Sequence, residues 1–593
     1  MREDIQCLRG LAIIFVFLYH LHSTVFVNGF LGVDIFFVIS GFLMAKNLTK
    51  NKTSKIGDFF KFYYKRFKRI LPLYYLIVFM TVVLVQLTLG DFWWETNWRY
   101  SISSLFLITN QLVIHDSADY FKQFQTDDKS PNLFLHLWSL GVEMQFYLIV
   151  PIIFFALQIL QKDILKFTAV LLTTVIGCVP FLLLNQHFAF NFMPLRLWQF
   201  SAGFCALYWR ILTNKWKEEK EKSEKDTVKF PIEKEDFVTV SIAILSFSIF
   251  PRHVDLQILR PLVTMAAATV IALESKDNQI LKSKFLIYIG NISYIVYLVH
   301  WPILSVFSMK SSFQTDLFVT LLTFLTSIFL HHLFEKQYLK LGWRPITSLL
   351  LFLLLSNGFL QYSIRNHKFW KLEYPPEVQK IIDQNVILQD VWTREPVVDE
   401  CVEEDLNNPV SPGWAYNYCL YPKGKGNFSI MMIGNSYVKN LNEHIRFSDY
   451  IKSPVQSNDT LVQTINENIA FYEKFAKKVY ILGALPLFKA NFLNYFMQYV
   501  IQNREDSESL HLNQKLADEE KKNVEKRLSM VKCEKCKFYD LGHVFYENGK
   551  YLTFDRKKML VYVDNSIHIT APGLALCESV FEENAREIMD TIS

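Results

Sequence analysis

Residues 9–44 read RGLAIIFVFLYHLHSTVFVNGFLGVDIFFVISGFLM, and this stretch decides the fold class. It holds two apolar runs, each close to the ~20 residues that a helix needs to cross a bilayer, with a short connection between them. No small-residue cleavage site follows the first run, which favours a retained span over a cleaved signal peptide. The stretch therefore predicts an integral membrane protein that begins with a helical hairpin.

Similar apolar runs continue to about residue 365. About 12 segments can be marked, against a spanning length of ~20 residues, at 8–25, 30–46, 71–90, 99–115, 137–160, 165–184, 194–213, 237–252, 257–274, 285–308, 314–334 and 346–363. The rest of the 593-residue chain has mixed charge and short alternating patterns, as a soluble α/β domain does. The predicted division is a polytopic α-helical transmembrane domain over residues 1–365 and an α/β sandwich over residues 372–593.

The basic residues indicate the orientation. The net charge of +5 is small and unevenly placed, which argues against nucleic-acid binding. Lysines and arginines crowd residues 46–69, 215–234, 276–284 and 336–344, and such loops tend to share the cytoplasmic side. All four basic loops lie on the same side only if one of the apolar segments does not cross the membrane. Segment 99–115 is the most polar of these segments. We therefore predict ~11 crossings, a cytoplasmic amino terminus and a carboxy-terminal domain in a lumen or outside the cell.

The cysteines and sequons fit this orientation. Cys7, Cys178 and Cys205 lie in or beside spans, where free thiols pack as small hydrophobes. Five cysteines lie in the soluble domain, where an oxidising compartment favours disulfides, and Cys401–Cys419 is the first expected pair. Cys533-x-x-Cys536 has no second such pair or spaced histidine pair, so no metal site is expected. Sequons at Asn427 and Asn458 suit a secretory-pathway face.

Ionisable side chains inside the predicted spans are costly and suggest a site. Arg9 and His20 lie about 16 Å apart along the first helix at 1.5 Å per residue, with His20 in the outer half. Asp34 enters the second span at a matching depth, so we expect it to face and orient His20. Glu143 and His300 fall at a similar depth on two other spans. A polar pair that merely locks helices is the alternative for His20 and Asp34.

Arg66 and Arg69 precede the third span, and their spacing puts both guanidinium groups on one helix face. That arrangement suits bidentate recognition of a polyphosphate donor. The alternative is anchoring of the span at the cytoplasmic surface, which basic residues at span ends often provide.

Together these segments resemble the acyltransferase-3 family of membrane O-acyltransferases, which includes bacterial enzymes that acetylate cell-surface glycans and a large nematode set. The resemblance covers residues 1 to about 345. It rests on RGLAIIFVFLYH, GFLGVDIFFVISGFL, KRFKRILPLYY, HLWSLGVEMQFYLIVP and SYIVYLVHWPI, in this order. It implies an acyl-CoA donor, usually acetyl-CoA, which binds as a substrate near Arg9, Arg66 and Arg69, with no permanently bound cofactor.

The resemblance also implies His20 as the catalytic base. Assisted by Asp34, it would deprotonate an acceptor hydroxyl or take the acyl group itself, while Glu143 and His300 position the acceptor or the leaving thiol. The acceptor would be a hydroxyl of a glycan or another molecule outside the cytoplasm. Both routes, direct transfer and an acyl-enzyme, stay open.

The soluble domain resembles the SGNH hydrolase family, which often follows this membrane unit. IMMIGNSYVKN resembles the nucleophile block and YVDNSIHITAPG the closing block, which implies Ser436 as nucleophile and His568 as base. Asn565 stands where the family spacing puts an aspartate, and Asp564 lies one residue earlier. An inactive or glycan-binding domain is therefore an alternative.

The leading hypothesis is a membrane O-acyltransferase. Two alternatives remain: a transporter that uses the membrane charges as a proton and substrate pathway, and a catalytically inactive binding member of the same fold. Inverted repeats would favour the transporter, and the sequence reveals none to inspection.

Overall fold

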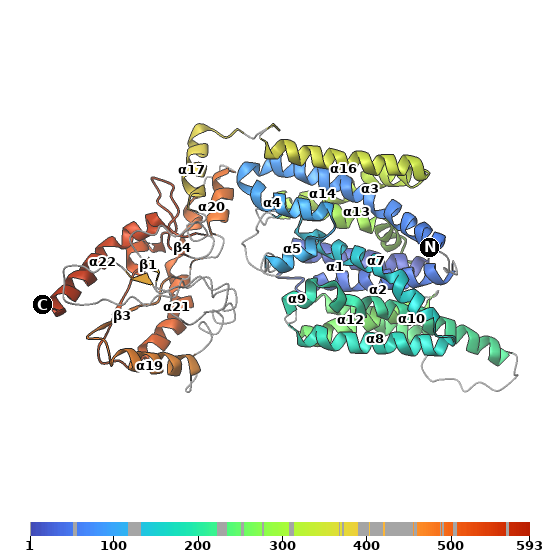
Figure 1. Ribbon diagram of the computed structural model, residues 1–593, viewed down its shortest axis with the longest axis horizontal. Coiled ribbons are helices and arrows are strands. Elements are labelled where there is room, and N and C mark those ends of the chain that lie inside the picture. Colours follow the sequence, from blue (N-terminus) through green and yellow to red (C-terminus); the bar gives the residue numbers. More distant parts are fainter. Residues whose placement is uncertain are drawn as a thin grey trace. The chain divides into compact units, whose positions relative to one another are not determined.

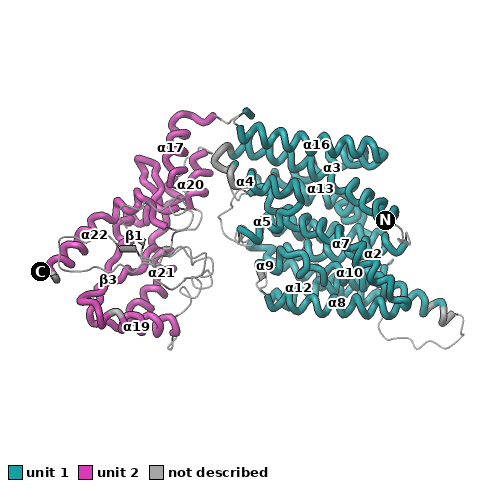
Figure 2. Tube along the Cα trace, in the orientation of Figure 1, with its two compact units in different colours: residues 1–372 teal, residues 373–593 magenta. Residues whose placement is uncertain are grey.

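The computed structural model describes most of the chain. The described residues are 2–50, 56–116, 132–184, 186–221, 234–250, 254–275, 278–307, 313–366, 368–369, 373–388, 402–403, 419–420, 455, 459–486, 488, 492–501, 507–564 and 568–592. The chain divides into two compact units, residues 1–372 and 373–593 (Figure 2). The first, called the helical unit below, consists of helices, and the second contains both helices and strands (Figure 1).

The helical unit is a bundle of long helices that run roughly side by side (Figure 1). Within its described residues, nine helical stretches are long and apolar enough to cross a membrane. They contain α1 (Glu3–Leu21), α2 (Gly32–Lys50), α3 (Ile56–Thr88), α7 (Trp138–Gln158), α8 (Asp163–Leu183), α12 (Leu256–Leu273), α13 (Lys284–Phe307), α14 (Phe313–Leu330) and α16 (Trp343–Arg365). Most side chains of α1 and α13 are buried, whereas α8 and α14 leave most of theirs exposed. The helix α2 is buried to the same extent as α13. Exposed apolar helices in a bundle that also contains buried ones suit a lipid environment.

The segment predicted not to cross is interrupted in the structure. Residues 99–115 divide between α4 (Gly90–Leu105) and the short helix α5 (Thr109–His115). Between them Leu107 has a φ of 58°, a left-handed conformation that ends a right-handed helix. Two further helices, α10 (Met193–Glu221) and α11 (Lys234–Ser248), lie outside the set of nine. The predicted ~11 crossings require both of them to span the bilayer and stay a prediction.

Helices α1 and α13 approach closely because glycines lie at their contact. A Cβ added at Gly10 would collide with the Leu286 carbonyl oxygen, and one added at Gly290 would collide with the Gln6 carbonyl oxygen. Small residues let membrane helices pack backbone against backbone. The two glycines therefore fix the distance between the helices that carry Arg9, His20 and His300.

Replacing Gly290 with alanine is expected to destabilise the helical unit. The added methyl group has no space, and overpacking of this kind costs about 1–3 kcal/mol. The measurement is the thermal transition of the detergent-solubilised full-length protein. Gly358→Ala is the matched control, because a Cβ at Gly358 in α16 meets nothing within 4 Å. Equal transition temperatures for the two variants would contradict the close contact.

The second unit is built around a parallel strand pair. Strand β3 (Val479–Leu482) pairs with β5 (Cys536–Tyr539), with Val479 opposite Cys536. Parallel strands need a long crossover, and α20 (Phe492–Ile501) and α21 (Gln514–Ser529) lie in it. The unit also contains α17 (Pro376–Val386), α19 (Thr460–Tyr472), α22 (Ala571–Ile592) and an antiparallel sheet of β4 (Leu512–Asn513), β7 (Lys550–Tyr551) and β6 (Tyr546–Glu547).

This architecture confirms the predicted fold class, an α-helical membrane unit followed by an α/β unit. The strand predicted in KVYILGALP is β3. The strand predicted in FSIMMIGNS lies outside the described residues, as do the sequons at Asn427 and Asn458.

The cysteines agree only in part with the predictions. Cys7, Cys178 and Cys205 are free thiols, as predicted. Cys533 and Cys536 form a disulfide, so neither sulfur is available as a thiolate ligand for a metal. Cys401 lies outside the described residues, and the predicted Cys401–Cys419 disulfide stays a prediction. The strands β1 (Val402–Glu403) and β2 (Cys419–Leu420) do pair antiparallel, with Glu403 opposite Cys419.

Candidate active site

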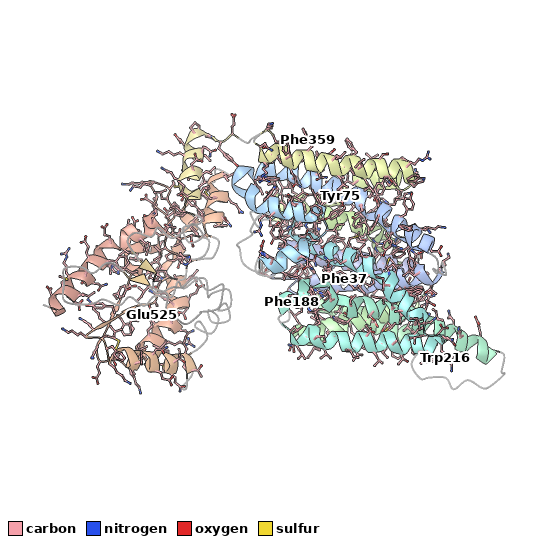
Figure 3. The ribbon with its side chains drawn as sticks, viewed as in Figure 1. Phe37, Tyr75, Phe188, Trp216, Phe359 and Glu525 are labelled. Atoms are coloured by element: carbon pink, nitrogen blue, oxygen red, sulfur yellow. A yellow bond between two sulfur atoms is a disulfide. The ribbon has the colours of Figure 1, made fainter. Side chains whose placement is uncertain are left out.

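Three arginines line one pocket of the helical unit, called the arginine pocket below. Arg9 comes from α1, and Arg66 and Arg69 come from one face of α3. A terminal nitrogen of Arg9 donates to Ser293 Oγ on α13 at 3.0 Å. Phe37, near the middle of the helical unit, also lines the pocket (Figure 3). The other lining residues are Val33, Phe36, Ile39, Ser40, Leu43, Met44, Ile70, Ser139, Leu140, Glu143, Tyr147, Tyr294 and Tyr297.

The arginine pocket carries an excess of positive charge. Its lining among the described residues includes one carboxylate, that of Glu143. Glu143 Oε1 accepts hydrogen bonds from Ser40 and Tyr147. No ion pair joins Arg9, Arg66 or Arg69 to a carboxylate in the part of the chain that the structure describes. Guanidinium groups in an apolar surrounding favour an anionic ligand, and phosphate oxygens accept their paired hydrogen bonds.

Three imidazoles gather nearby and form the histidine cluster. His20 from α1 and His300 from α13 lie with Nδ1 of His20 and Nε2 of His300 2.7 Å apart. His136, from the short helix η2 (Leu135–Leu137), packs edge-on against His300 with ring centroids 5.7 Å apart. All three side chains are buried. The structure thus brings the predicted His20 and His300 into direct contact and adds His136.

Hydrogen bonds to backbone carbonyls determine which ring nitrogens carry protons. His300 Nδ1 lies 3.0 Å from the Val296 carbonyl oxygen, which can only accept, so this nitrogen is the donor. In the neutral His300 ring, Nε2 then holds the lone pair, and His20 Nδ1 donates to it. Neutral His20 consequently has its lone pair on Nε2, the atom that could take a proton or an acyl group.

A proline explains how His136 is held. Pro302 has no N–H, so within α13 it leaves the Leu298 carbonyl oxygen without its helical donor. His136 Nε2 lies 3.1 Å from that oxygen and donates to it. The motif SYIVYLVHWPI therefore places His300 in the cluster and also provides the carbonyl that holds His136.

The arginine pocket and the histidine cluster are two parts of one site along α1 and α13. On α1, Arg9 and His20 are about 16 Å apart at 1.5 Å per residue, and on α13 Ser293 and His300 are about 10 Å apart. Arg9 contacts Ser293, and His20 contacts His300. Tyr297 lies between them, lines the pocket and packs against the His300 ring.

The predicted pairing of His20 with Asp34 is wrong. The two carboxylate oxygens of Asp34 accept from Arg196 at 2.8 Å and from Arg260 at 3.2 Å. All three side chains are buried, and Arg196 has no exposed surface. Asp34 faces α10 and α12 because a buried carboxylate is stabilised far more by two guanidinium groups than by a neutral imidazole.

Asparagine at position 34 is expected to destabilise the helical unit strongly. It would leave Arg196 and Arg260 buried without a counter-charge, and breaking a buried pair costs roughly 3–5 kcal/mol. The fraction of full-length protein that stays folded in detergent on heating measures this loss. Asp163→Asn is the control, because Asp163 pairs with the half-exposed Lys215. If both variants melt alike, the Asp34 pairs contribute no more than a surface pair.

Glu143 also lies elsewhere than predicted. It was expected at one depth with His20, Asp34 and His300, but it lines the arginine pocket with Arg9. Sequence reasoning could place each charge along its own helix, yet the rotation of a helix that is apolar on most sides has no clear signal. It also passed over His136, Ser40, Tyr147, Tyr297 and Arg260, which the structure adds to these clusters.

In the second unit, the closing block holds an Asp–His pair. Asp564 Oδ2 lies 3.4 Å from His568 Nδ1, and Asp564 Oδ1 accepts from the His568 backbone N–H at 2.9 Å. Asp564 therefore takes the position beside the histidine that family spacing gave to residue 565. Ser436, the predicted nucleophile, lies outside the described residues, and so does Asn565.

Comparison with known proteins identifies the family of the chain. A family model described as an acyltransferase domain matches residues 2–332, more than half of the chain. The chain belongs to the acyltransferase-3 family. A model described as the SGNH domain fused to such domains matches residues 444–583, beginning after Ser436. Both resemblances inferred from the sequence are confirmed.

Three similar proteins come from bacteria. YrhL of Bacillus subtilis, provisionally named a peptidoglycan O-acetyltransferase, is 38% identical over 28% of this chain and 25% of its own. The O-acetyltransferase OatA of Staphylococcus aureus is 34% identical over 25% of this chain and 23% of its own. A provisionally named Staphylococcus aureus O-acetyltransferase, SACOL0978, is 27% identical over 57% of this chain and 58% of its own. The chain thus spans about a quarter of the length of the first two relatives. No solved structure matches it.

Proposed function

We propose that this acyltransferase-3 protein is a membrane O-acyltransferase that moves an acyl group, most simply acetyl, from acyl-CoA to a hydroxyl. The single observation that carries the proposal is the two-part site on α1 and α13. A pocket lined by three arginines lies at one part, and a buried histidine pair with a defined lone pair lies at the other. This arrangement suits a donor that carries phosphates at one end and a reactive thioester at the other.

The proposed chemistry uses groups that the site supplies. Arg9, Arg66 and Arg69 bind the phosphates of the donor. His20 Nε2 takes the proton of the acceptor hydroxyl while that oxygen bonds to the acyl carbon. The carbon–sulfur bond breaks, and the same proton passes to the CoA sulfur, so an ester and a free thiol result. His300 acts as a positioning residue, since it fixes the His20 ring through Nδ1.

The orientation follows from the basic loops. With the amino terminus in the cytoplasm, the arginine pocket lies in the cytoplasmic half of the bundle and the histidine cluster in the outer half. The acyl group would then cross most of the bilayer inside the protein. Because relatives are named as acetyltransferases of peptidoglycan or of unstated acceptors, a glycan hydroxyl is the acceptor we favour.

For the second unit we propose a subsequent step at Ser436, His568 and Asp564. Asp564 would orient His568, which would take the Ser436 proton as that oxygen attacks the ester formed at His20. The first hydroxyl leaves with this proton, and the acyl-serine then passes its acyl group to the hydroxyl of the final acceptor. Ser436→Ala is then expected to abolish label in the final acceptor while CoA release continues in its first turnovers. If Ser436→Ala matches the wild type in both quantities, the second unit has no chemical step.

The experiment is label transfer from radiolabelled acetyl-CoA in membranes that contain the full chain. Alkali-labile label in a hydroxyl acceptor, with equimolar release of free thiol, is the expected result. If the protein neither binds CoA nor transfers label, the site is that of a transporter or an inactive binding protein.

A further inference from the structure

We infer that Tyr297 limits the length of the acyl group that reaches His20. This inference rests on the proposed function and goes beyond it, since it assigns donor specificity to one side chain. It concerns a stretch of α13 that borders both the arginine pocket and the histidine cluster.

The helical repeat puts Tyr297 between the two parts of the site. Ser293, Tyr297 and His300 follow each other at intervals of four and three residues, so they share one face of α13. At the two ends of this face, Ser293 contacts Arg9 and His300 contacts His20. A donor held by the arginines and pointing its thioester toward His20 therefore places its acyl group beside Tyr297.

Tyr297 forms a wall there. Its side chain lines the arginine pocket, whereas His20, His136 and His300 do not line it. On its other side the ring packs against His136 and His300, with centroids 5.7 and 5.6 Å away. The residue is 7% exposed. The ring therefore fills the space that a longer acyl chain would need.

Two hydrogen bonds keep the ring in this position. The Tyr297 hydroxyl donates to the His136 carbonyl oxygen, and it accepts from the Ser139 hydroxyl. Its single proton is used by the carbonyl, which cannot donate, so Ser139 must be the donor in the second bond. A ring fixed at both its face and its hydroxyl cannot swing aside without breaking these bonds, and each costs roughly 0.5–1.5 kcal/mol.

The expected selectivity is steep for small acyl groups. A methylene changes binding in a closed apolar space by roughly 10–200-fold. We therefore expect the wild type to transfer acetyl at least about tenfold faster than butyryl. Tyr297→Ala removes the wall and should raise the butyryl-to-acetyl ratio of kcat/KM by about tenfold or more. Tyr297→Phe keeps the ring and should change this ratio far less.

The test measures transfer from acetyl-CoA, propionyl-CoA and butyryl-CoA by the full chain in membranes. Tyr74→Phe is the matched control, because the buried Tyr74 hydroxyl also donates to a carbonyl, that of Ser104, and Tyr74 does not line the pocket. Its ratio should equal that of the wild type. A Tyr297→Ala protein that transfers acetyl and keeps the wild-type butyryl-to-acetyl ratio of kcat/KM would overturn the inference. The proposed function would then remain intact.

If Tyr297→Ala does not accumulate in the membrane, Tyr297→Leu replaces it in the test. Leucine is also smaller than tyrosine, so this variant should raise the butyryl-to-acetyl ratio of kcat/KM as well. An unchanged ratio in Tyr297→Leu would then overturn the inference. Absence of transfer from every acyl-CoA by the wild type would overturn the proposed function and this inference with it.

Discussion

His20→Ala should lower acyl transfer by roughly 10²–10⁴-fold, the usual contribution of a positioned general base. The lone pair on Nε2 of His20 is the proton acceptor of the proposed reaction, and its tautomer is fixed through His300. Removing the ring leaves the donor pocket intact, since Arg9 lies about 16 Å away along α1 at 1.5 Å per residue. The rate should therefore fall while the KM for acetyl-CoA changes little.

His22→Ala is the control for this variant. His22 follows two residues later, is partly exposed, and contacts Asp316 at 3.2 Å. It should keep wild-type transfer. A His20→Ala protein that is correctly inserted and as active as His22→Ala would remove His20 from the chemistry and leave the histidine cluster a structural feature.

Arg66→Ala is expected to weaken the use of acetyl-CoA by about 10–100-fold in kcat/KM, since a hydrogen bond to a charged group is worth roughly 1.5–3 kcal/mol. Arg66 lines the pocket with its Nε buried and without a hydrogen-bond partner, so a phosphate oxygen would satisfy it. Arg66→Lys keeps the charge and loses the planar fork, and it should fall between the alanine variant and the wild type.

Comparing acyl donors with and without phosphates tests the role of Arg66 more directly than kcat/KM for acetyl-CoA alone. Acetyl-pantetheine carries the thioester and lacks the phosphates of acetyl-CoA, so Arg66→Ala and wild type should use it equally well. Lys65→Ala, the loss of an exposed neighbouring charge on α3, should resemble the wild type with both donors. An Arg66→Ala defect of equal size with the two donors would contradict phosphate binding.

Much of the helical unit could be predicted because its signals are local. Long apolar runs give the spans, and the segment predicted not to cross, 99–115, is absent from the nine helical stretches of spanning length among the described residues. The three-residue spacing of Arg66 and Arg69 gave their shared face, and the pocket contains both. The same holds for β3 in the second unit, where a short apolar run between charged residues became a strand.

The partners of buried charges could not be predicted in the same way. Asp34 was assigned to His20 because a short connection brings their helices together, but its partners come from α10 and α12, more than 160 positions away along the chain. Only packing decides which side of an apolar helix faces which neighbour. The Pro302 that frees the Leu298 carbonyl is a local signal. Its use depends on His136, which precedes Leu298 by 162 residues.

The central claim is that the arginine pocket and the histidine cluster together transfer an acyl group from CoA to a hydroxyl. The most direct measurement is transfer of label from acetyl-CoA by the purified full chain in liposomes, with free thiol measured in the same samples. The account predicts alkali-labile label and equimolar thiol from the wild type, and both at a rate roughly 10²–10⁴-fold lower from His20→Ala. Failure of the wild-type protein to bind CoA and to release thiol from acetyl-CoA would contradict it.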